Sequence, residues 1–262
     1  RVRGVMFTGS TEVATLLQRN IASRLDAQGR PIPLIAETGG MNAMIVDSSA
    51  LTEQVVIDVL ASAFDSAGQR CSALRVLCLQ DEIADHTLKM LRGAMAECRM
   101  GNPGRLTTDI GPVIDSEAKA NIERHIQTMR SKGRQVFQAV RENSEDAREW
   151  QSGTFVAPTL IELDDFAELQ KEVFGPVLHV VRYNRNQLPE LIEQINASGY
   201  GLTLGVHTRI DETIAQVTGS AQVGNLYVNR NMVGAVVGVQ PFGGEGLSGT
   251  GPKAGGPLYL YR

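Results

Sequence analysis

The stretch from residue 43 to residue 79 reads AMIVDSSALTEQVVIDVLASAFDSAGQRCSALRVLCL. It begins with a short apolar run over 43–46, continues with apolar residues at helical spacing over 55–64, and ends with a second apolar run over 74–79. This pattern predicts a strand, a helix and a second strand, and the second strand has too few polar positions to be an edge. A strand–helix–strand order is typical of an α/β fold with a mostly parallel sheet.

The same alternation continues on both sides of this stretch. Further strands are expected at residues 5–7, 34–36, 155–161, 177–183, 202–206 and 226–228, and further helices at 13–25, 83–95, 118–129, 188–195 and 210–221. The glycine- and proline-rich segment 100–112 and the charged segment 141–148 are predicted to be loops, the second of them solvated. The length of 262 residues allows one large domain or two small ones.

Composition places the chain among ordinary globular proteins, with 42% hydrophobic residues, 21% charged residues and a net charge of −4. The charges are interspersed, and no basic patch interleaved with aromatic residues indicates nucleic-acid binding. No apolar run approaches the roughly 18 residues needed to span a membrane, and no signal peptide is visible. Because the first residue is Arg1 and not Met, we expect the chain to be a piece of a longer protein.

The three cysteines, Cys71, Cys78 and Cys98, form no disulfide or zinc pattern, since they are 7 and 20 positions apart. This favours a reducing cytoplasm. Cys78 lies in an apolar run and is predicted to pack in the core, and Cys98 is predicted to be structural. Only Cys71 lies among small and polar residues, in Gly68-Gln69-Arg70-Cys71-Ser72, where a thiolate could be exposed.

Glu37 stands 34 positions before Cys71, in Glu37-Thr38-Gly39-Gly40. A thiolate can attack a carbonyl carbon, and a carboxylate can take a proton from water, so the two suffice for covalent catalysis through a thioester. The alternative is a buried structural cysteine and a surface glutamate.

Two further segments carry glycine at positions where a ligand could approach. The strand at 5–7 leads through Gly9 and Ser10 into a helix with Glu12 in its first turn, which predicts either an anion site or an ordinary capped surface helix. The segment 240–251 reads QPFGGEGLSGTG and is predicted to be a structured loop, since Phe242 and Leu247 indicate packing; a flexible linker is the alternative.

Five motifs occur together in this order: FTGS at 7–10, ETGG at 37–40, GQRC at 68–71, KEVFGP at 171–176 and PFGG at 241–244. Their order and spacing resemble the NAD(P)-dependent aldehyde dehydrogenase superfamily over nearly the whole chain. The resemblance implies a three-layer catalytic domain over 39–240, preceded by the last part of a Rossmann-like NAD-binding domain over 1–38. A glycine-rich substrate-anchor segment over 241–262 would return towards the cofactor domain.

The resemblance also implies roles for single residues. Cys71 matches the family's nucleophile and Glu37 its general base. Gly9, Ser10, Thr38 and Gly39 match cofactor-binding positions, with Ser10 at a cofactor phosphate. Glu172 matches the carboxylate that holds the nicotinamide ribose, and Phe174 packs beside that end of NAD. Ser72, Gly255 and Gly256 match groups that bind the α-carboxylate of the substrate.

The motif GQRCS and the tail SGTGPKAGGP at 248–257 are more specific. They resemble the Δ1-pyrroline-5-carboxylate dehydrogenase branch, and within it the aldehyde dehydrogenase module of the bifunctional proline utilization A enzymes of bacteria. This implies oxidation of L-glutamate γ-semialdehyde with NAD. It also implies a FAD-dependent proline dehydrogenase module upstream of Arg1, a homo-oligomer in the full-length protein, and a cytoplasmic location.

The family's oxyanion-hole asparagine and its adenosine pocket would lie upstream of the chain, and no GxGxxG fingerprint follows a predicted strand and opens a predicted helix. We therefore expect the isolated chain to bind NAD weakly or not at all. Three alternatives remain: a dehydrogenase of another aldehyde, a non-catalytic folding or interaction module, and a cysteine hydrolase. His86, His125, His179 and His207 have no metal-ligand spacing and are predicted to be surface or packing residues.

Overall fold

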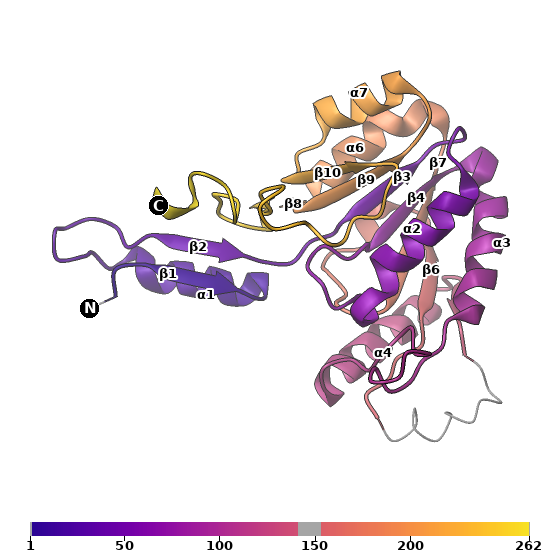
Figure 1. The fold of residues 1–262 in the computed structure, drawn as a ribbon, viewed down its shortest axis with the longest axis horizontal. Helices are drawn as coiled ribbons and strands as arrows, with labels where there is room; N and C mark the ends of the chain where they lie inside the picture. The colour runs from indigo at the N-terminus through magenta and orange to yellow at the C-terminus, as the bar shows by residue number, and fades with distance from the viewer. Residues whose placement is uncertain (1, 141–152, 262) are drawn as a thin grey trace.

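The structure, a computed structural model, describes residues 2–140 and 153–261. Its main body is built on a seven-stranded sheet with the order β10-β9-β3-β4-β7-β6-β5 (Figure 1). Neighbouring strands run parallel, except β5 and β6, which are antiparallel. The strands are β3 (Ala43–Val46), β4 (Val76–Gln80), β5 (Val136–Gln138), β6 (Thr159–Leu163), β7 (Val177–Tyr183), β9 (Thr203–His207) and β10 (Asn225–Val228). The predicted α/β fold with a mostly parallel sheet is confirmed.

Helices cover both faces of this sheet, as right-handed crossovers require. The connection from β3 through α2 to β4 moves one way along the sheet, whereas that from β7 through α6 to β9 moves the opposite way, so the same hand places α2 and α6 on opposite faces. Figure 1 shows α2 and α3 on one face and α6 and α7 on the other. The helices are α2 (Thr52–Phe64), α3 (Asp81–Glu97), α4 (Ser116–Ser131), α6 (Leu188–Ala197) and α7 (Asp211–Ser220).

The core lies between the sheet and these helices. β3 and β4 are buried along their whole length, and the side chains of Ile45 and Leu77 are fully inaccessible. Strands covered on both faces carry continuous apolar runs rather than alternating ones. β4 lies between β3 and β7, as expected for a strand that is not an edge. Cys78 on β4 is fully buried, which confirms its packing role.

A second, two-stranded sheet lies beside the main body. Its strands β1 (Val5–Thr8) and β2 (Leu34–Glu37) are parallel, and α1 (Thr11–Ala22) packs on them. Figure 1 shows this unit extending away from the large sheet, with the glycine-rich tail running back along β2. Within that tail β11 (Glu245–Gly246) pairs with β8 (Tyr200–Gly201) of the main body. Among the residues described, no helix combines the length and the apolar character needed to cross a membrane.

Hydrogen bonds fix the tail in place. The backbone N–H of Ala36 donates to Thr250 Oγ1 at 2.9 Å, and the Thr250 N–H donates to the Ala36 carbonyl at 2.9 Å. Phe242 and Ala254 exchange two backbone hydrogen bonds. The tail is therefore the structured loop that was predicted, and not a linker. Leu247 packs only in part, because the residue is 46% exposed although its side chain lies beside Gly199.

Several predicted boundaries need correction. The strand predicted over 155–161 begins only at Thr159, and that predicted over 202–206 begins one residue later. The strand predicted to start at Leu74 starts at Val76, because the Leu74 N–H donates to the Ser62 carbonyl of α2 instead of joining the ladder. The first helix ends at Ala22, so the apolar residue at position 25 lies outside it.

Three short strands, β5, β8 and β11, were not predicted. β8 and β11 have two residues each, too few for an alternating pattern to appear in the sequence. The predicted loop over 141–148 lies outside the described residues.

Candidate active site

The predicted site residues lie where the two sheets meet. Glu37 is the last residue of β2, and the chain then passes through Gly39 and Gly40 to β3. Cys71 lies in the loop that leads from α2 into β4. The carboxyl end of the small sheet thus meets the amino edge of the large one.

Glu37 is held by the tail. Its Oε2 accepts a hydrogen bond from the Gly244 N–H at 3.2 Å, while Oε1 is buried and has no hydrogen-bond partner among the described residues. Burial raises the pKa of Glu37 to about 7, and the Gly244 N–H opposes this shift. A carboxyl group with such a pKa can both accept and release a proton near neutral pH.

Cys71 is half-buried, so the residue keeps part of its contact with solvent, unlike Cys78. Burial raises its pKa, and the negative charges of Glu172 and Glu37 raise it further, while backbone N–H groups of Ser72 and Cys71 act in the opposite direction. Folding therefore brings Cys71 within electrostatic reach of both carboxylates. Their placement on opposite sides of one cleft stays a prediction.

The loop that carries Cys71 is anchored by Asn42, which is 2% exposed. The side-chain amide of Asn42 donates to the carbonyls of Cys71 and Ala73 at 2.6 and 2.8 Å, and its Oδ1 accepts from the Thr203 N–H at 3.1 Å. One buried amide thus ties the nucleophile loop to β9. Thr203 also reaches Ser72, since its hydroxyl donates to the Ser72 carbonyl at 3.5 Å.

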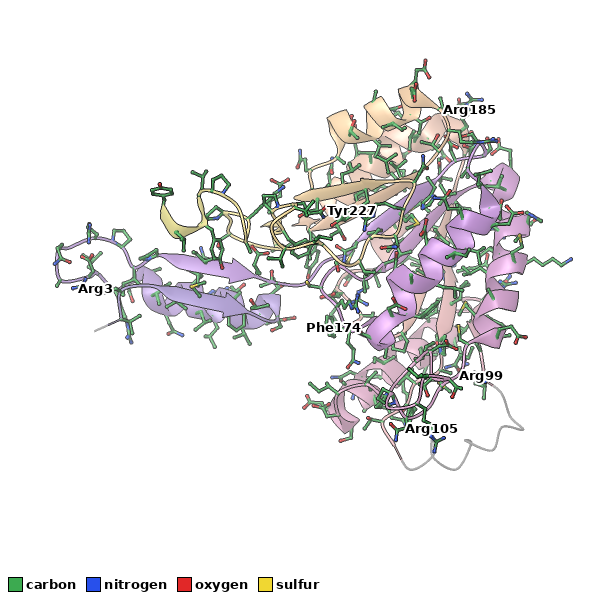
Figure 2. The ribbon with its side chains drawn as sticks, in the orientation of Figure 1. Arg3, Arg99, Arg105, Phe174, Arg185 and Tyr227 are labelled. Atoms are coloured by element: carbon green, nitrogen blue, oxygen red, sulfur yellow. The ribbon has the colours of Figure 1, made fainter. Side chains whose placement is uncertain are left out.

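Glu172 lies over the turn that follows β2. A Cβ atom on Gly39 would stand 1.8 Å from Glu172 Oε2, so only glycine leaves room for this carboxylate. Burial raises the pKa of Glu172, and the guanidinium of Arg75 acts against that shift. Arg75 also lies 5.1 Å from the centre of the Phe174 ring. Figure 2 shows Phe174 at the junction between the small sheet and the main body, where the residue is 45% exposed.

Gly9 and Ser10 lie beside Glu37, because β1 and β2 are parallel and end at the same edge. The Gly9 N–H donates to the Glu37 carbonyl at 3.1 Å. Ser10 caps α1: its hydroxyl oxygen accepts from the Val13 N–H at 3.3 Å. Thr38 is buried against the tail, and its hydroxyl donates to the Leu247 carbonyl at 2.5 Å. The six proposed cofactor positions therefore cluster around this edge.

The predicted carboxylate-binding residues are less closely joined. Ser72 is 7% exposed and follows Cys71 in the nucleophile loop. Gly255 has a φ of +74°, and the Gly256 N–H donates to the Lys253 carbonyl, so the two form a tight turn in the tail. In the part of the chain that the structure describes, the hydrogen bonds do not link Ser72 to this turn.

The residues present fit the nicotinamide half of NAD. Three groups lie at the same junction. They are the exposed Phe174, the Glu172 carboxylate, whose side chain is 15% exposed, and the amino end of α1. We therefore assign Glu172, Phe174 and Ser10 to the cofactor side of the site, and this assignment remains a proposal.

Arg75 and Asn42 were missed in the sequence. A signal existed for Arg75, because a charged residue inside the apolar run over 74–79 must find buried partners if that run forms a strand. Asn42 gave no comparable signal, since its partners are backbone groups 29 to 161 positions away along the chain.

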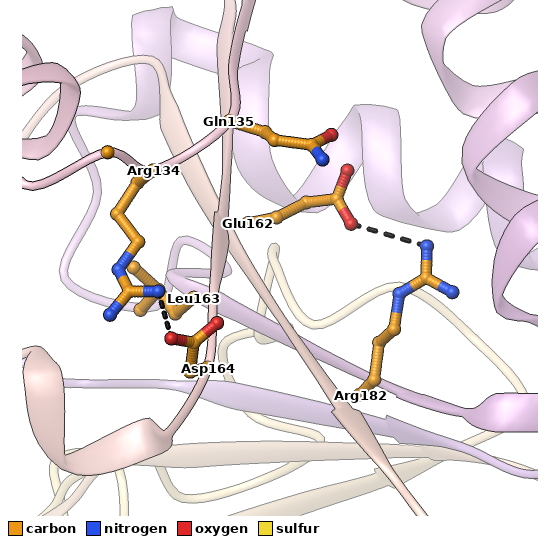
Figure 3. A pocket seen from close by; sticks show the side chains of 7 residues that line it. Arg134, Gln135, Glu162, Leu163, Asp164 and Arg182 are labelled. Atoms are coloured by element: carbon orange, nitrogen blue, oxygen red, sulfur yellow. Dashed lines mark hydrogen bonds and ion pairs between the residues drawn. The ribbon is translucent and has the colours of Figure 1, made fainter.

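Other polar features lie away from this junction. A cavity of about 390 Å³ is lined by residues that form two ion pairs. Arg134 pairs with Asp164, and Arg182 pairs with Glu162 (Figure 3). A second cavity of about 200 Å³ lies at the carboxyl ends of β3, β4 and β7. The described residues contain no cluster of three or more side chains suited to a metal.

Histidines and the remaining cysteine have packing roles. His179 and His207 are buried, as predicted for packing residues. The Cys98 thiol donates to the Ala94 carbonyl at 3.6 Å within one helical turn.

The chain matches the aldehyde dehydrogenase family over residues 1–261, and it therefore belongs to that family. It is 99% identical over 262 residues to the bifunctional protein PutA of Escherichia coli (strain K12), covering 100% of this chain and 20% of that protein. It is 35% identical to the 1-pyrroline-5-carboxylate dehydrogenase of Geobacillus kaustophilus (strain HTA426), covering 99% of this chain and 49% of that protein.

Solved structures agree with these relatives. A crystal structure of a bifunctional proline utilization A (PutA) protein superposes with a TM-score of 0.91 at 53% identity, over 98% of this chain and 25% of that one. A 1-pyrroline-5-carboxylate dehydrogenase from Thermus with bound NAD gives a TM-score of 0.87 at 35% identity, over 99% and 49%. The chain thus spans between a fifth and a half of these relatives. The predicted aldehyde dehydrogenase fold is confirmed.

Proposed function

We propose that this chain carries the catalytic residues of an NAD-dependent L-glutamate γ-semialdehyde dehydrogenase. Its substrate would be the aldehyde that forms when Δ1-pyrroline-5-carboxylate opens, and its product L-glutamate. The observation that carries the proposal is the placement of Cys71 and Glu37: they come from separate segments, and the Glu37 charge acts on the Cys71 thiol. Relatives named 1-pyrroline-5-carboxylate dehydrogenase support the choice of aldehyde.

The reaction begins at the Cys71 sulfur. Because burial and two carboxylates raise the pKa of Cys71, the thiol must first release its proton to solvent water to form the reactive thiolate. The thiolate adds to the aldehyde carbon. Backbone N–H groups, including that of Cys71, stabilise the resulting oxyanion. Loss of hydride from this carbon leaves a thioester on Cys71.

Glu37 then completes the reaction. Its carboxylate takes a proton from water, hydroxide adds to the thioester carbonyl, and the carbon–sulfur bond breaks to release the acid and restore the Cys71 thiolate. Bound NAD supplies the hydride acceptor. Glu172 and Phe174 would hold its nicotinamide end, and Gly9, Ser10, Thr38 and Gly39 would line the edge beside it.

Substrate choice rests on the α-carboxylate. Ser72 and the turn at Gly255 and Gly256 are the groups proposed to bind it, since backbone N–H groups without side chains can surround an anion. A dehydrogenase of an uncharged aldehyde would not need them.

The longer context is also proposed. Residues 1–38 would end the NAD-binding domain, 39–240 would form the catalytic domain and 241–262 the substrate-anchor segment. The name of the bifunctional relatives supports a second activity in the same polypeptide, for which we propose an upstream proline dehydrogenase module with FAD. A homo-oligomer and a cytoplasmic location complete the proposal, the latter resting on the cysteine pattern.

The test compares two aldehydes in the full-length polypeptide. We expect NAD-dependent oxidation of L-glutamate γ-semialdehyde to exceed that of 4-aminobutanal, the same molecule without its carboxylate, by at least about 100-fold in kcat/KM. The Cys71→Ser variant should lose both activities. Equal rates for the two aldehydes would favour a dehydrogenase of another aldehyde. No oxidation by the wild type would favour a non-catalytic module.

A further inference from the structure

Arg75 is the largest fully buried charged side chain of the described residues, and its guanidinium lies directly under the nucleophile loop. All five of its N–H groups can be paired with acceptors. Nε and Nη2 donate to Glu172 Oε1 at 3.2 and 2.9 Å, Nη1 to the Gly68 and Gly175 carbonyls at 2.7 and 3.3 Å, and Nη2 also to the Arg70 carbonyl at 2.9 Å.

These acceptors lie on the two segments that carry the functional residues. Gly68 and Arg70 belong to the loop that presents Cys71. Glu172 and Gly175 flank Phe174 on the cofactor side. The two segments also touch directly, since a Cβ atom on Gly68 would stand 2.2 Å from the Gly175 carbonyl oxygen. The guanidinium therefore holds both segments with a single planar group.

The segment before Cys71 needs such support. Ser66, Ala67 and Gly68 have φ values of 56°, 54° and 65°, a left-handed run that L residues rarely adopt. Backbone in this conformation persists only where its surroundings hold it. The Arg75 bond to the Gly68 carbonyl closes the end of this run.

The backbone of Arg75 is fixed as well. Its carbonyl accepts from the His179 N–H at 2.9 Å and from His179 Nδ1 at 3.1 Å. Since a carbonyl only accepts, Nδ1 carries the hydrogen, and Nε2 accepts from His125 Nε2 at 2.8 Å. Burial lowers the pKa of His179 to about 3, so the ring stays neutral in this arrangement. Arg75 is thus anchored on β7 and, through His125, on α4.

We propose that Arg75 is a positioning residue that joins the Cys71 loop to the Glu172 segment and so fixes the separation between the thiol and the nicotinamide end of the cofactor. This role rests on the proposed function. Lysine cannot replace Arg75, because an ammonium is a point donor and cannot reach carbonyls on two segments and a carboxylate at once.

The test uses the full-length polypeptide with Arg75→Lys and, as a second variant, Arg75→Gln. Two activities are measured. NAD-dependent aldehyde oxidation needs both segments, whereas hydrolysis of an activated ester without NAD needs Cys71 and Glu37 but not the Glu172 segment. We expect oxidation to fall at least about tenfold further than ester hydrolysis, with a higher KM for NAD. Arg182→Lys, at a half-exposed arginine beside the cavity of Figure 3, is the matched control and should change neither activity.

The outcomes separate the two proposals. A parallel loss of both activities, no loss at all, or failure of both Arg75 variants to fold would overturn the positioning role. If the wild type oxidises the aldehyde but the Arg75 variants do not lose more oxidation than ester hydrolysis, only the positioning role of Arg75 is contradicted. Absence of wild-type oxidation contradicts the proposed function and, with it, the role of Arg75.

Discussion

At the scale of single residues, burial acts in the same direction on Glu37 and Cys71. It raises the pKa of both groups, so each holds its proton more tightly than it would in water. The raised pKa makes the Glu37 carboxylate a base suited to neutral pH. The raised pKa of the Cys71 thiol makes its reactivity depend on a proton acceptor and on pH.

The raised pKa of Glu37 has a consequence for stability. Because the pKa is about 7 in the folded chain and 4.5 ordinarily, the folded state binds this proton more tightly than the unfolded state. The resulting stabilisation is fully present below about pH 4.5 and is lost as the pH rises through 7. We expect Glu37→Gln to be more stable than the wild type at about pH 8, by about 1 kcal/mol after allowance for solvent screening. At about pH 4 we expect the two to be equal.

Urea unfolding of the 262-residue chain at both pH values measures this difference. Glu193→Gln, at an exposed position of α6, is the control and should change stability at neither pH. A Glu37→Gln variant that is less stable at the higher pH would show that the Glu37 carboxylate has a stabilising partner.

Single residues also mark how far the sequence could lead. Cys71 and Glu37 were predictable from side-chain chemistry and from the small residues around them. Arg75 was overlooked because the run over 74–79 was treated as apolar, although a buried guanidinium requires several acceptors. Those acceptors are backbone carbonyls, and sequence does not reveal which carbonyls face a side chain.

At the scale of elements, glycine positions decide how closely the segments approach. Gly39 follows β2, and the carboxylate of Glu172 fills the space that any side chain there would need. Gly93, in the middle of α3, faces open space and is under no such constraint.

We expect Gly39→Ala to displace Glu172 and to lower NAD-dependent oxidation by at least about 100-fold. Gly93→Ala should retain full activity and stabilise the chain by about 0.5–1 kcal/mol, since alanine is the better helix former. Steady-state kinetics and urea unfolding of both variants check this. Full activity in Gly39→Ala would mean that Glu172 does not need to occupy its observed position.

Elements were predictable in proportion to their length and burial. The strand at Val177–Tyr183 was predicted with the bounds observed, because its seven residues form one continuous apolar-rich run. β8 and β11 pair residues that are far apart in the chain, and tertiary contact alone makes them strands. The start of β4 was misplaced because the Leu74 N–H donates to the Ser62 carbonyl of α2 and so does not join the strand ladder.

At the scale of the whole molecule, the site needs both sheets. The small sheet has two strands, and apolar residues of its β1–α1 unit, Met6 and Leu16, are 68% and 58% exposed. The relatives are two to five times longer, and the chain covers 49% and 20% of them. The cofactor side is therefore the less completely packed part of this chain.

We expect calorimetric titration of NAD into the isolated chain to give no binding tighter than millimolar. A two-stranded unit offers the nicotinamide end a surface but gives the other half of the cofactor little to contact. The full-length polypeptide is the control and should bind NAD in the same titration. Micromolar binding by the isolated chain would contradict the expectation that part of the NAD site lies outside this chain.

The most direct test of the shared role of Cys71 and Glu37 is mass spectrometry of the Glu37→Gln full-length polypeptide after reaction with L-glutamate γ-semialdehyde and NAD. The account predicts that glutamyl thioester accumulates on the peptide that contains Cys71, because the amide cannot take a proton from water. The wild type should turn over without accumulating it. Turnover by Glu37→Gln at the wild-type rate, or an adduct on a different residue, would contradict it.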